Sequence, residues 1–235
     1  MFGSLLLDSE AWDVHTLAED AILLAYQGEK RQALKAVHRL FKAESLIRHA
    51  YITDRVAGYN SLALYFDADR ITAEELITEL QSLNLSEATE SKVEESTEIP
   101  VCYELGTDWE EVEHQSGLSR DEIIEIHRSG SYTVAFVGFM PGFTYLDGLD
   151  HRLQCRRKED PETRVPAGSV GIGGMFTGIY SRPSPGGWQI IGRTPLDLFD
   201  EYSMPPLKVN TGSKITFRRI SKAEFKELSS AGDDD

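Results

Sequence analysis

The fold of this chain is decided by four successive motifs: FVGFMPGFTYLDGL (residues 136–149), TRVPAGSVGIGG (163–174), TGIY (177–180) and SPGGWQIIGRT (184–194). Eleven of the 19 glycines and six of the 9 prolines lie between Gly138 and Pro195. Large aromatic residues are interleaved with them, which a disordered Gly/Pro-rich linker would lack. Because glycine permits positive φ and close backbone approach, the pattern predicts tight loops around a concave surface.

The second part of the chain reads as a β-rich domain. From Tyr132 onward, short apolar runs alternate with Gly/Pro turns, which indicates a β-barrel or sandwich. Helices are predicted before it, near 108–115 and 120–128, because Thr107 with Glu110 and Ser119 with Glu122 have capping-box spacing. A short helix is expected near 223–228.

The first part alternates strand and helix signals. Strands are predicted at 21–26, 47–52 and 62–66, and helices at 29–41 and 72–83. This β-α-β-β-α order suggests a small ferredoxin-like α+β layer, which a further strand at 98–103 would complete. Residues 85–97 are polar and acidic without apolar periodicity. We therefore expect a ferredoxin-like domain over 1–90 and a β-barrel domain over 98–228.

Composition excludes several classes of protein. The net charge of −15 argues against nucleic-acid binding, which needs a basic face. No apolar run approaches the ~20 residues that span a bilayer, and the N-terminus has no signal-peptide pattern. Only Cys102 and Cys155 are present, which is typical of reduced thiols. These features predict a cytoplasmic protein. We also expect no metal site, because the six histidines show no ligand spacing.

Basic residues gather in and beside the glycine-rich region of this acidic chain, which could attract an anionic ligand. Arg164 lies next to Pro166, and Arg193 ends an apolar run. A guanidinium beside constrained backbone is a good ligand for a carboxylate or phosphate, although a structural ion pair is an equal alternative.

Four other side chains are candidates for the same region. Gln189 and Tyr180 could supply an amide and a phenol to a ligand, but Tyr180 is as easily a core residue. Ser169 lacks the G-x-S-x-G frame of a nucleophile, so its hydroxyl is expected in a turn or on a ligand. His127, at the end of a predicted helix, is either a general acid/base near the groove or a helix-terminal cation.

The four motifs, with SPGGWQIIGRT extended through PLDLFD (195–200), resemble the KipI / allophanate hydrolase subunit 1 family. The similarity is continuous from about residue 98 to 217. The resemblance implies a ferredoxin-like domain followed by a cyclophilin-like β-barrel. Three residues depart from the family pattern: Arg156, where Pro is common, Glu162, where Arg is common, and Phe176, where Gln is common.

The resemblance also implies function by partnership. The first expectation is the B subunit of a heteromeric ATP-dependent 5-oxoprolinase, which opens 5-oxo-L-proline to L-glutamate with a homologous second barrel protein, the C subunit, and with an A subunit. Arg164, Ser169, Tyr180, Gln189 and Arg193 would bind substrate, His127 would act as acid or base, and ATP would be bound or shared. The alternatives are a non-enzymatic inhibitor of a sensor histidine kinase and a carboxyltransferase-type subunit that serves urea or another amide.

Overall fold

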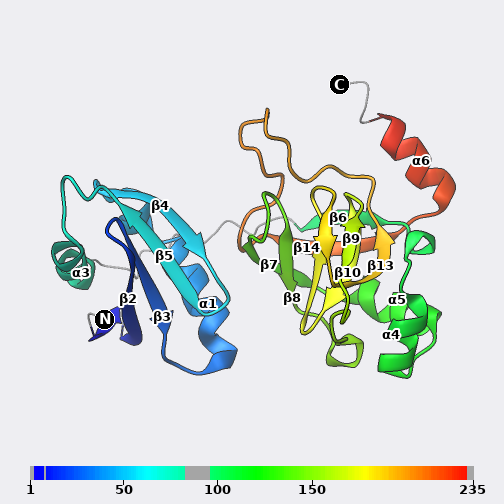
Figure 1. Ribbon diagram of the computed structural model, residues 1–235, viewed down its shortest axis with the longest axis horizontal. Coiled ribbons are helices and arrows are strands. Elements are labelled where there is room, and N and C mark those ends of the chain that lie inside the picture. Colours follow the sequence, from blue (N-terminus) through cyan, green and yellow to red (C-terminus); the bar gives the residue numbers. More distant parts are fainter. Residues whose placement is uncertain (1–2, 8, 83–95, 232–235) are drawn as a thin grey trace. The chain divides into compact units, whose positions relative to one another are not determined.

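The computed structural model describes residues 3–7, 9–82 and 96–231 (Figure 1). The chain divides into two compact units, Met1–Val93 and Glu94–Asp235. Each unit has its own hydrophobic core and is described by itself. The expected α+β class is confirmed by an antiparallel sheet with helices in the first unit and a nearly closed barrel in the second.

The first unit is built on a five-stranded antiparallel sheet of order β1-β2-β3-β5-β4. Its strands are β1 (Gly3–Leu7), β2 (Glu10–Ala18), β3 (Ala21–Tyr26), β4 (Ile52–Ala57) and β5 (Ser61–Phe66). Helix α1 (Lys30–Phe41) packs on β3, β4 and β5, and α3 (Ala73–Ser82) packs on β1. The predicted strands 21–26 and 62–66 and both predicted helices are confirmed; residue 83 lies outside the described residues.

Two strand predictions for this unit are wrong. Residues 47–52 do not form a strand, because Ile47 ends the short helix α2 (Glu44–Ile47) and β4 begins only at Ile52. Nor does 98–103 complete this sheet. The position beside β3 is filled by β2, whose polar outer residues gave no clear strand signal. Strand β6 (Thr97–Val101) instead pairs in parallel with β14 of the second unit.

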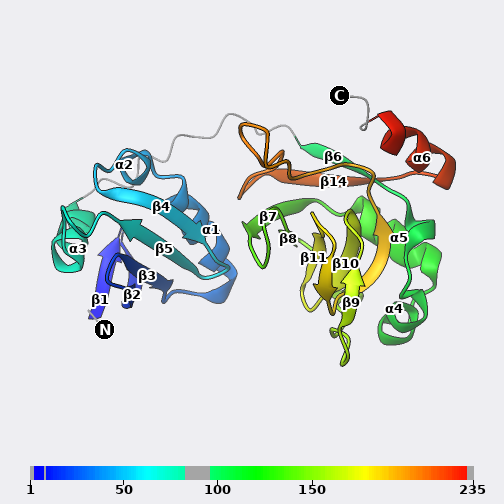
Figure 2. The same cartoon turned by 45° about the horizontal axis from the view of Figure 1, so that its top comes forward.

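The second unit is a mixed seven-stranded barrel of order β13-β10-β11-β8-β7-β14-β6 (Figure 2). After β6 its strands are β7 (Tyr132–Val137), β8 (Thr144–Asp147), β10 (Ser169–Gly173), β11 (Phe176–Ile179), β13 (Gln189–Arg193) and β14 (Lys214–Arg219). Backbone hydrogen bonds of 2.8 and 3.1 Å between Cys102 and Arg193 join the two edges. A separate two-stranded antiparallel sheet, the β9/β12 sheet, pairs β9 (Glu162–Val165) with β12 (Ser184–Gly186).

Helices cover one side of the barrel. Helix α4 (Trp109–Ser116) packs on β13, and α5 (Arg120–Ser129) packs on β14. The predicted capping box at Ser119 is confirmed, since Ser119 and Glu122 exchange hydrogen bonds. The one predicted at Thr107 is wrong: the N-cap of α4 is Asp108, and its carboxylate is bonded elsewhere. Helix α6 (Lys222–Ala231) contains the predicted helix 223–228, and no described helix is long and apolar enough to cross a membrane.

Candidate functional site

The barrel carries an open hollow of about 250 Å³ that we call the aromatic hollow. It lies between the β7–β8 loop, β8 and the end of β11 on one side and the β9/β12 sheet on the other. Its lining comes from three of the four motifs and from two residues that precede the motif 163–174. The lining residues are Phe139, Phe143, Tyr145, Arg157, Pro161, Tyr180, Pro185, Gly186, Gly187 and Trp188. The concave surface predicted from the glycine pattern is therefore present.

Glycines make room for the indole that forms one wall. A Cβ on Gly173 would lie 2.5 Å from ring atoms of Trp188, and one on Gly178 would lie 2.9 Å from the same ring. Gly186 plays the same part for Tyr180, because a Cβ there would lie 2.3 Å from the phenol oxygen. The glycines of GIGG and TGIY thus permit close packing of rings on backbone.

The rings of the aromatic hollow pack edge to face. Phe143 lies 4.9 Å from Tyr180 and 5.3 Å from Trp188, centroid to centroid, and Tyr145 lies 5.5 Å from Trp188. Such T-shaped pairs stabilise one arrangement of the wall beyond simple burial. Phe176, one of the departures from the family pattern, packs against Tyr145 at 5.9 Å and extends this cluster.

One cation edges the aromatic hollow. The guanidinium of Arg157 lies 5.6 Å from the Trp188 ring centroid, within cation–π range, and the side chain is exposed. Burial raises the pKa of Tyr180 to about 12, and burial also raises the pKa of Tyr145, while the charge of Arg157 acts in the opposite direction on both. Both phenols therefore stay protonated at neutral pH and can donate hydrogen bonds beside a positive charge.

Arg157 also borders a second, charged hollow of about 530 Å³, the charged trough. The trough is lined by Asp108, Glu111, Gln115, Arg156, Arg157, Lys158, Glu159, Asp160 and Gln189. The Asp108 carboxylate accepts from Lys158 Nζ at 2.9 Å and from the backbone amide of Ile190 at 2.7 Å. Asp108 thereby fixes the segment that carries Arg157 against β13, which accounts for its failure to cap α4.

The structure divides the candidate residues among several places. Tyr180 lines the aromatic hollow, and Gln189 lines the trough, where its amide donates to the Arg156 carbonyl at 3.1 Å. Arg193 lines a different hollow of about 250 Å³ beside Phe225 of α6, and its Nε donates to the Ala167 carbonyl at 2.7 Å.

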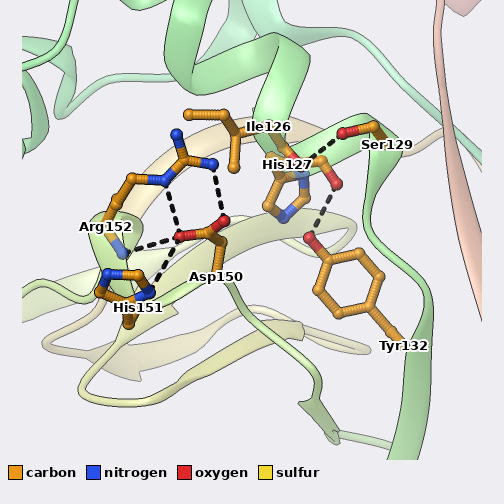
Figure 3. A network of polar contacts seen from close by, with 7 residues as sticks. All are labelled: Ile126, His127, Ser129, Tyr132, Asp150, His151 and Arg152. Carbon is orange, nitrogen blue, oxygen red and sulfur yellow. Dashed lines mark hydrogen bonds and ion pairs between the residues drawn. The ribbon is translucent and has the colours of Figure 1, made fainter.

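Ser169 and Arg164 lie outside these hollows. Ser169 is buried in β10 and pairs with Arg193 across the sheet, whereas Arg164 is exposed on β9. Among the described residues, neither Arg164 nor Arg193 forms the ion pair considered as an alternative. Three other cations of this region, Arg152, Lys158 and Arg182, form ion pairs, and Figure 3 shows that of Arg152 with Asp150.

His127 lies inside the barrel core and not on a hollow. Its side chain is 0% exposed, its Nδ1 lies 2.7 Å from the Tyr103 hydroxyl, and its Nε2 lies 3.0 Å from the Thr177 hydroxyl. The ring stacks on Phe217 at 4.5 Å. Figure 3 shows its backbone carbonyl at the end of α5, accepting from Tyr132 at 2.7 Å. No described hollow reaches the imidazole, so the function proposed below uses it neither as acid nor as base.

Burial lowers the pKa of His127 from 6.5 to about 3, so the folded barrel keeps this imidazole neutral. That also argues against the helix-terminal cation. In the unfolded chain His127 is protonated below about pH 6.5, whereas in the folded chain it is protonated only below about pH 3. Acid therefore favours unfolding. As the pH falls between these limits, we expect His127 to lower the free energy of unfolding by about 1.4 kcal/mol per pH unit.

Urea unfolding at pH 7 and pH 5 checks this acid sensitivity. In His127→Gln, a neutral polar replacement, the loss of stability between the two pH values should be smaller by about 2 kcal/mol, whatever the variant costs at pH 7. Equal pH slopes in the two proteins would show that the imidazole does not titrate as its burial requires.

Sequence reasoning missed the residues that unite the site. In the sequence, Arg157 is one of several cations beside the motifs, and Tyr145 is one of several aromatic residues within them. Their spacing from Trp188 in the sequence gives no sign of contact, because the β9/β12 sheet and the barrel strands bring them together. Asp108 looked like part of a helix start.

The fold defines a two-unit α+β protein whose barrel carries an aromatic hollow with a cation at its edge. A family model described as "Carboxyltransferase domain, subdomain C and D" matches residues 12–209, so the chain belongs to that family. The resemblance seen in the motifs is thereby confirmed.

Named relatives agree with this assignment. The chain is 36% identical over 207 residues to the 5-oxoprolinase B subunit of Escherichia coli O157:H7, a match that covers 86% of this chain and 94% of that one. It is 48% identical over 130 residues to the protein of the same name in Bacillus subtilis (strain 168), where the match covers 54% of each chain and so spans about half of that relative. The chain is thus a homologue of the 5-oxoprolinase B subunit over most of its length.

Solved structures support the fold. A conserved uncharacterized protein from Pyrococcus horikoshii has 39% sequence identity and a TM-score of 0.55, with 90% of this chain and 99% of that chain covered. The urea carboxylase of Kluyveromyces lactis has a TM-score of 0.71 over 98% of this chain and 24% of that one. At 18% identity, the second likeness shows the fold alone.

Proposed function

We propose that this chain is the B subunit of an ATP-dependent 5-oxoprolinase, which opens the lactam of 5-oxo-L-proline to L-glutamate together with partner proteins. The observation that carries the proposal is Arg157 at the edge of the aromatic hollow, beside two protonated phenols. The homology to the B subunits of 5-oxoprolinases supports the choice of reaction.

The substrate chemistry fits this arrangement. The five-membered ring would lie against Trp188 and Phe143, and its carboxylate would pair with Arg157. The hydroxyls of Tyr145 and Tyr180 would donate toward the lactam oxygen, where negative charge develops as the amide opens. The Gln189 side chain would contact the substrate from the charged trough. Arg164, Ser169 and Arg193 are not part of this proposed site, because they lie elsewhere on the barrel.

Partners would supply the remaining chemistry. Neither the aromatic hollow nor the charged trough holds a histidine, a cysteine or a serine among its described lining residues. Opening an unstrained lactam needs activation, which ATP would provide by forming a phosphorylated intermediate with a partner's help. We therefore propose that an A subunit and a homologous C subunit complete the complex, and that ATP binds chiefly on them.

Reconstitution tests the proposal. The chain should co-purify with its candidate A and C partners, and the complex should release L-glutamate from 5-oxo-L-proline only when ATP is present. Omission of this chain should reduce the rate to background. A complex that assembles without this chain and keeps its full rate would contradict the proposal.

A carboxyltransferase-type protein is the second candidate, favoured by the description of the matching family. In that case the chain would transfer a carboxyl group to urea or another amide. Urea-dependent activity of a complex with a biotin carboxylase, without 5-oxoprolinase activity, would favour this candidate over the first.

A further inference from the structure

Phe139 has a backbone conformation that a bulky side chain rarely adopts. Its φ is +68°, and Ser9 is the other non-glycine residue of the described chain with positive φ. Phenylalanine is strained there because its Cβ meets the backbone, and such strain persists only where neighbouring structure imposes it. Phe139 is nevertheless 65% exposed, so burial does not offset the strain.

The loop around Phe139 is clamped on both sides. The Gly138 amide donates to the Phe143 carbonyl at 3.1 Å, and the Phe143 amide donates to the Met140 carbonyl at 3.2 Å. The Ser181 hydroxyl donates to the Pro141 carbonyl at 2.5 Å. These bonds hold the turn that forces Phe139 into its conformation.

The forced conformation directs the ring to the aromatic hollow. Phe139 is one of the lining residues, and its ring lies 5.6 Å from that of Phe143 at an interplanar angle of 82°. A residue that both lines a hollow and keeps most of its surface in solvent lies at the rim. An uncovered ring at the rim can gain contact area only when a ligand arrives.

We propose that Phe139 is a specificity-determining residue that covers a ring bound in the aromatic hollow and thereby favours a cyclic ligand over an open chain. The inference rests on the proposed function: its substrate is a compact five-membered ring, whereas its product, L-glutamate, is an extended chain with two carboxylates. The ring packs between Phe139 and the indole wall; the open chain loses that contact, which helps product leave.

Two variants at this position separate the ring from the strain. Phe139→Asn removes the ring and tolerates positive φ, while Phe139→Tyr keeps both the ring and the strain. In equilibrium binding to the full chain, Phe139→Asn should bind 5-oxo-L-proline about two- to tenfold more weakly, with L-glutamate unchanged. Its melting temperature should stay level or rise, because strain is relieved. Phe139→Tyr should bind as the wild type does.

The inference would be overturned if Phe139→Asn bound 5-oxo-L-proline normally, or if its melting temperature fell and both affinities fell together, which is the signature of a structural role alone. A third probe, 2-pyrrolidinone, carries the ring without the carboxylate. If 2-pyrrolidinone binding depends on Phe139 while 5-oxo-L-proline does not bind at all, the role of Phe139 over a bound ring is supported. The same result would contradict 5-oxo-L-proline as the substrate. Binding of 2-pyrrolidinone that is independent of Phe139 would overturn the cover itself.

Discussion

In the reconstituted complex, Arg157→Gln should lower kcat/KM for 5-oxo-L-proline by about 100-fold, the upper range for losing a hydrogen bond to a charged partner. Arg157 is the cation at the edge of the aromatic hollow, and the described residues form no ion pair with it. A carboxylate that pairs with Arg157 would be held in the ground state and the transition state alike. The loss should therefore appear mainly in KM.

Arg156→Gln is the matched control. Arg156 is the preceding residue, is also exposed and lines the charged trough, but it does not line the aromatic hollow. Its replacement should change kcat/KM by less than about threefold, the scale of a surface charge. Steady-state glutamate release measures both variants. Equal losses in the two would indicate a general field effect and not a carboxylate bound at Arg157.

Gly178→Ala should lower the free energy of unfolding by about 2–3 kcal/mol, as overpacking does. The added Cβ would lie 2.6 Å from the Thr144 backbone carbonyl and 2.9 Å from the Trp188 ring. The strand β8 and the indole wall must both shift, so the aromatic hollow should also bind its ligand less well. Urea unfolding at pH 7 gives the change in stability.

Gly138→Ala is the control for this substitution. Apart from its two neighbours in the chain, no residue has an atom within 4 Å of a Cβ placed on Gly138, and its φ is not positive. We expect its stability to change by less than about 0.5 kcal/mol, since nothing need move. If the two alanine variants were equally stable, the close packing of Trp188 on the glycine strands would not be real.

Much of the fold was readable because its signals are local. The helix that became α1 and the strands that became β3 and β5 have strong apolar periodicity, and the Ser119 capping box marks the start of α5. The pairing of strands that are far apart in the sequence was not predicted correctly. The apolar residues of 97–101 predict a strand but not its partner, and the structure pairs it in parallel with β14.

The site was only partly predictable for the same reason. Glycines and aromatics in one run predicted the hollow correctly, because their packing depends on nearby strands. The cations were ranked by backbone context alone, which favoured Arg164 and Arg193. Only the folded structure shows that Arg157 is the cation beside Trp188. The position of His127 near a helix end suggests an accessible side chain, but its ring faces the barrel core and stacks on Phe217.

The most direct test of this account is the structure of the assembled complex with 5-oxo-L-proline bound. We predict that the lactam ring lies against Trp188 in the aromatic hollow, with its carboxylate on Arg157 and Phe139 over its open face. Substrate found in the hollow beside Arg193, or wholly within a partner protein, would contradict the central claim.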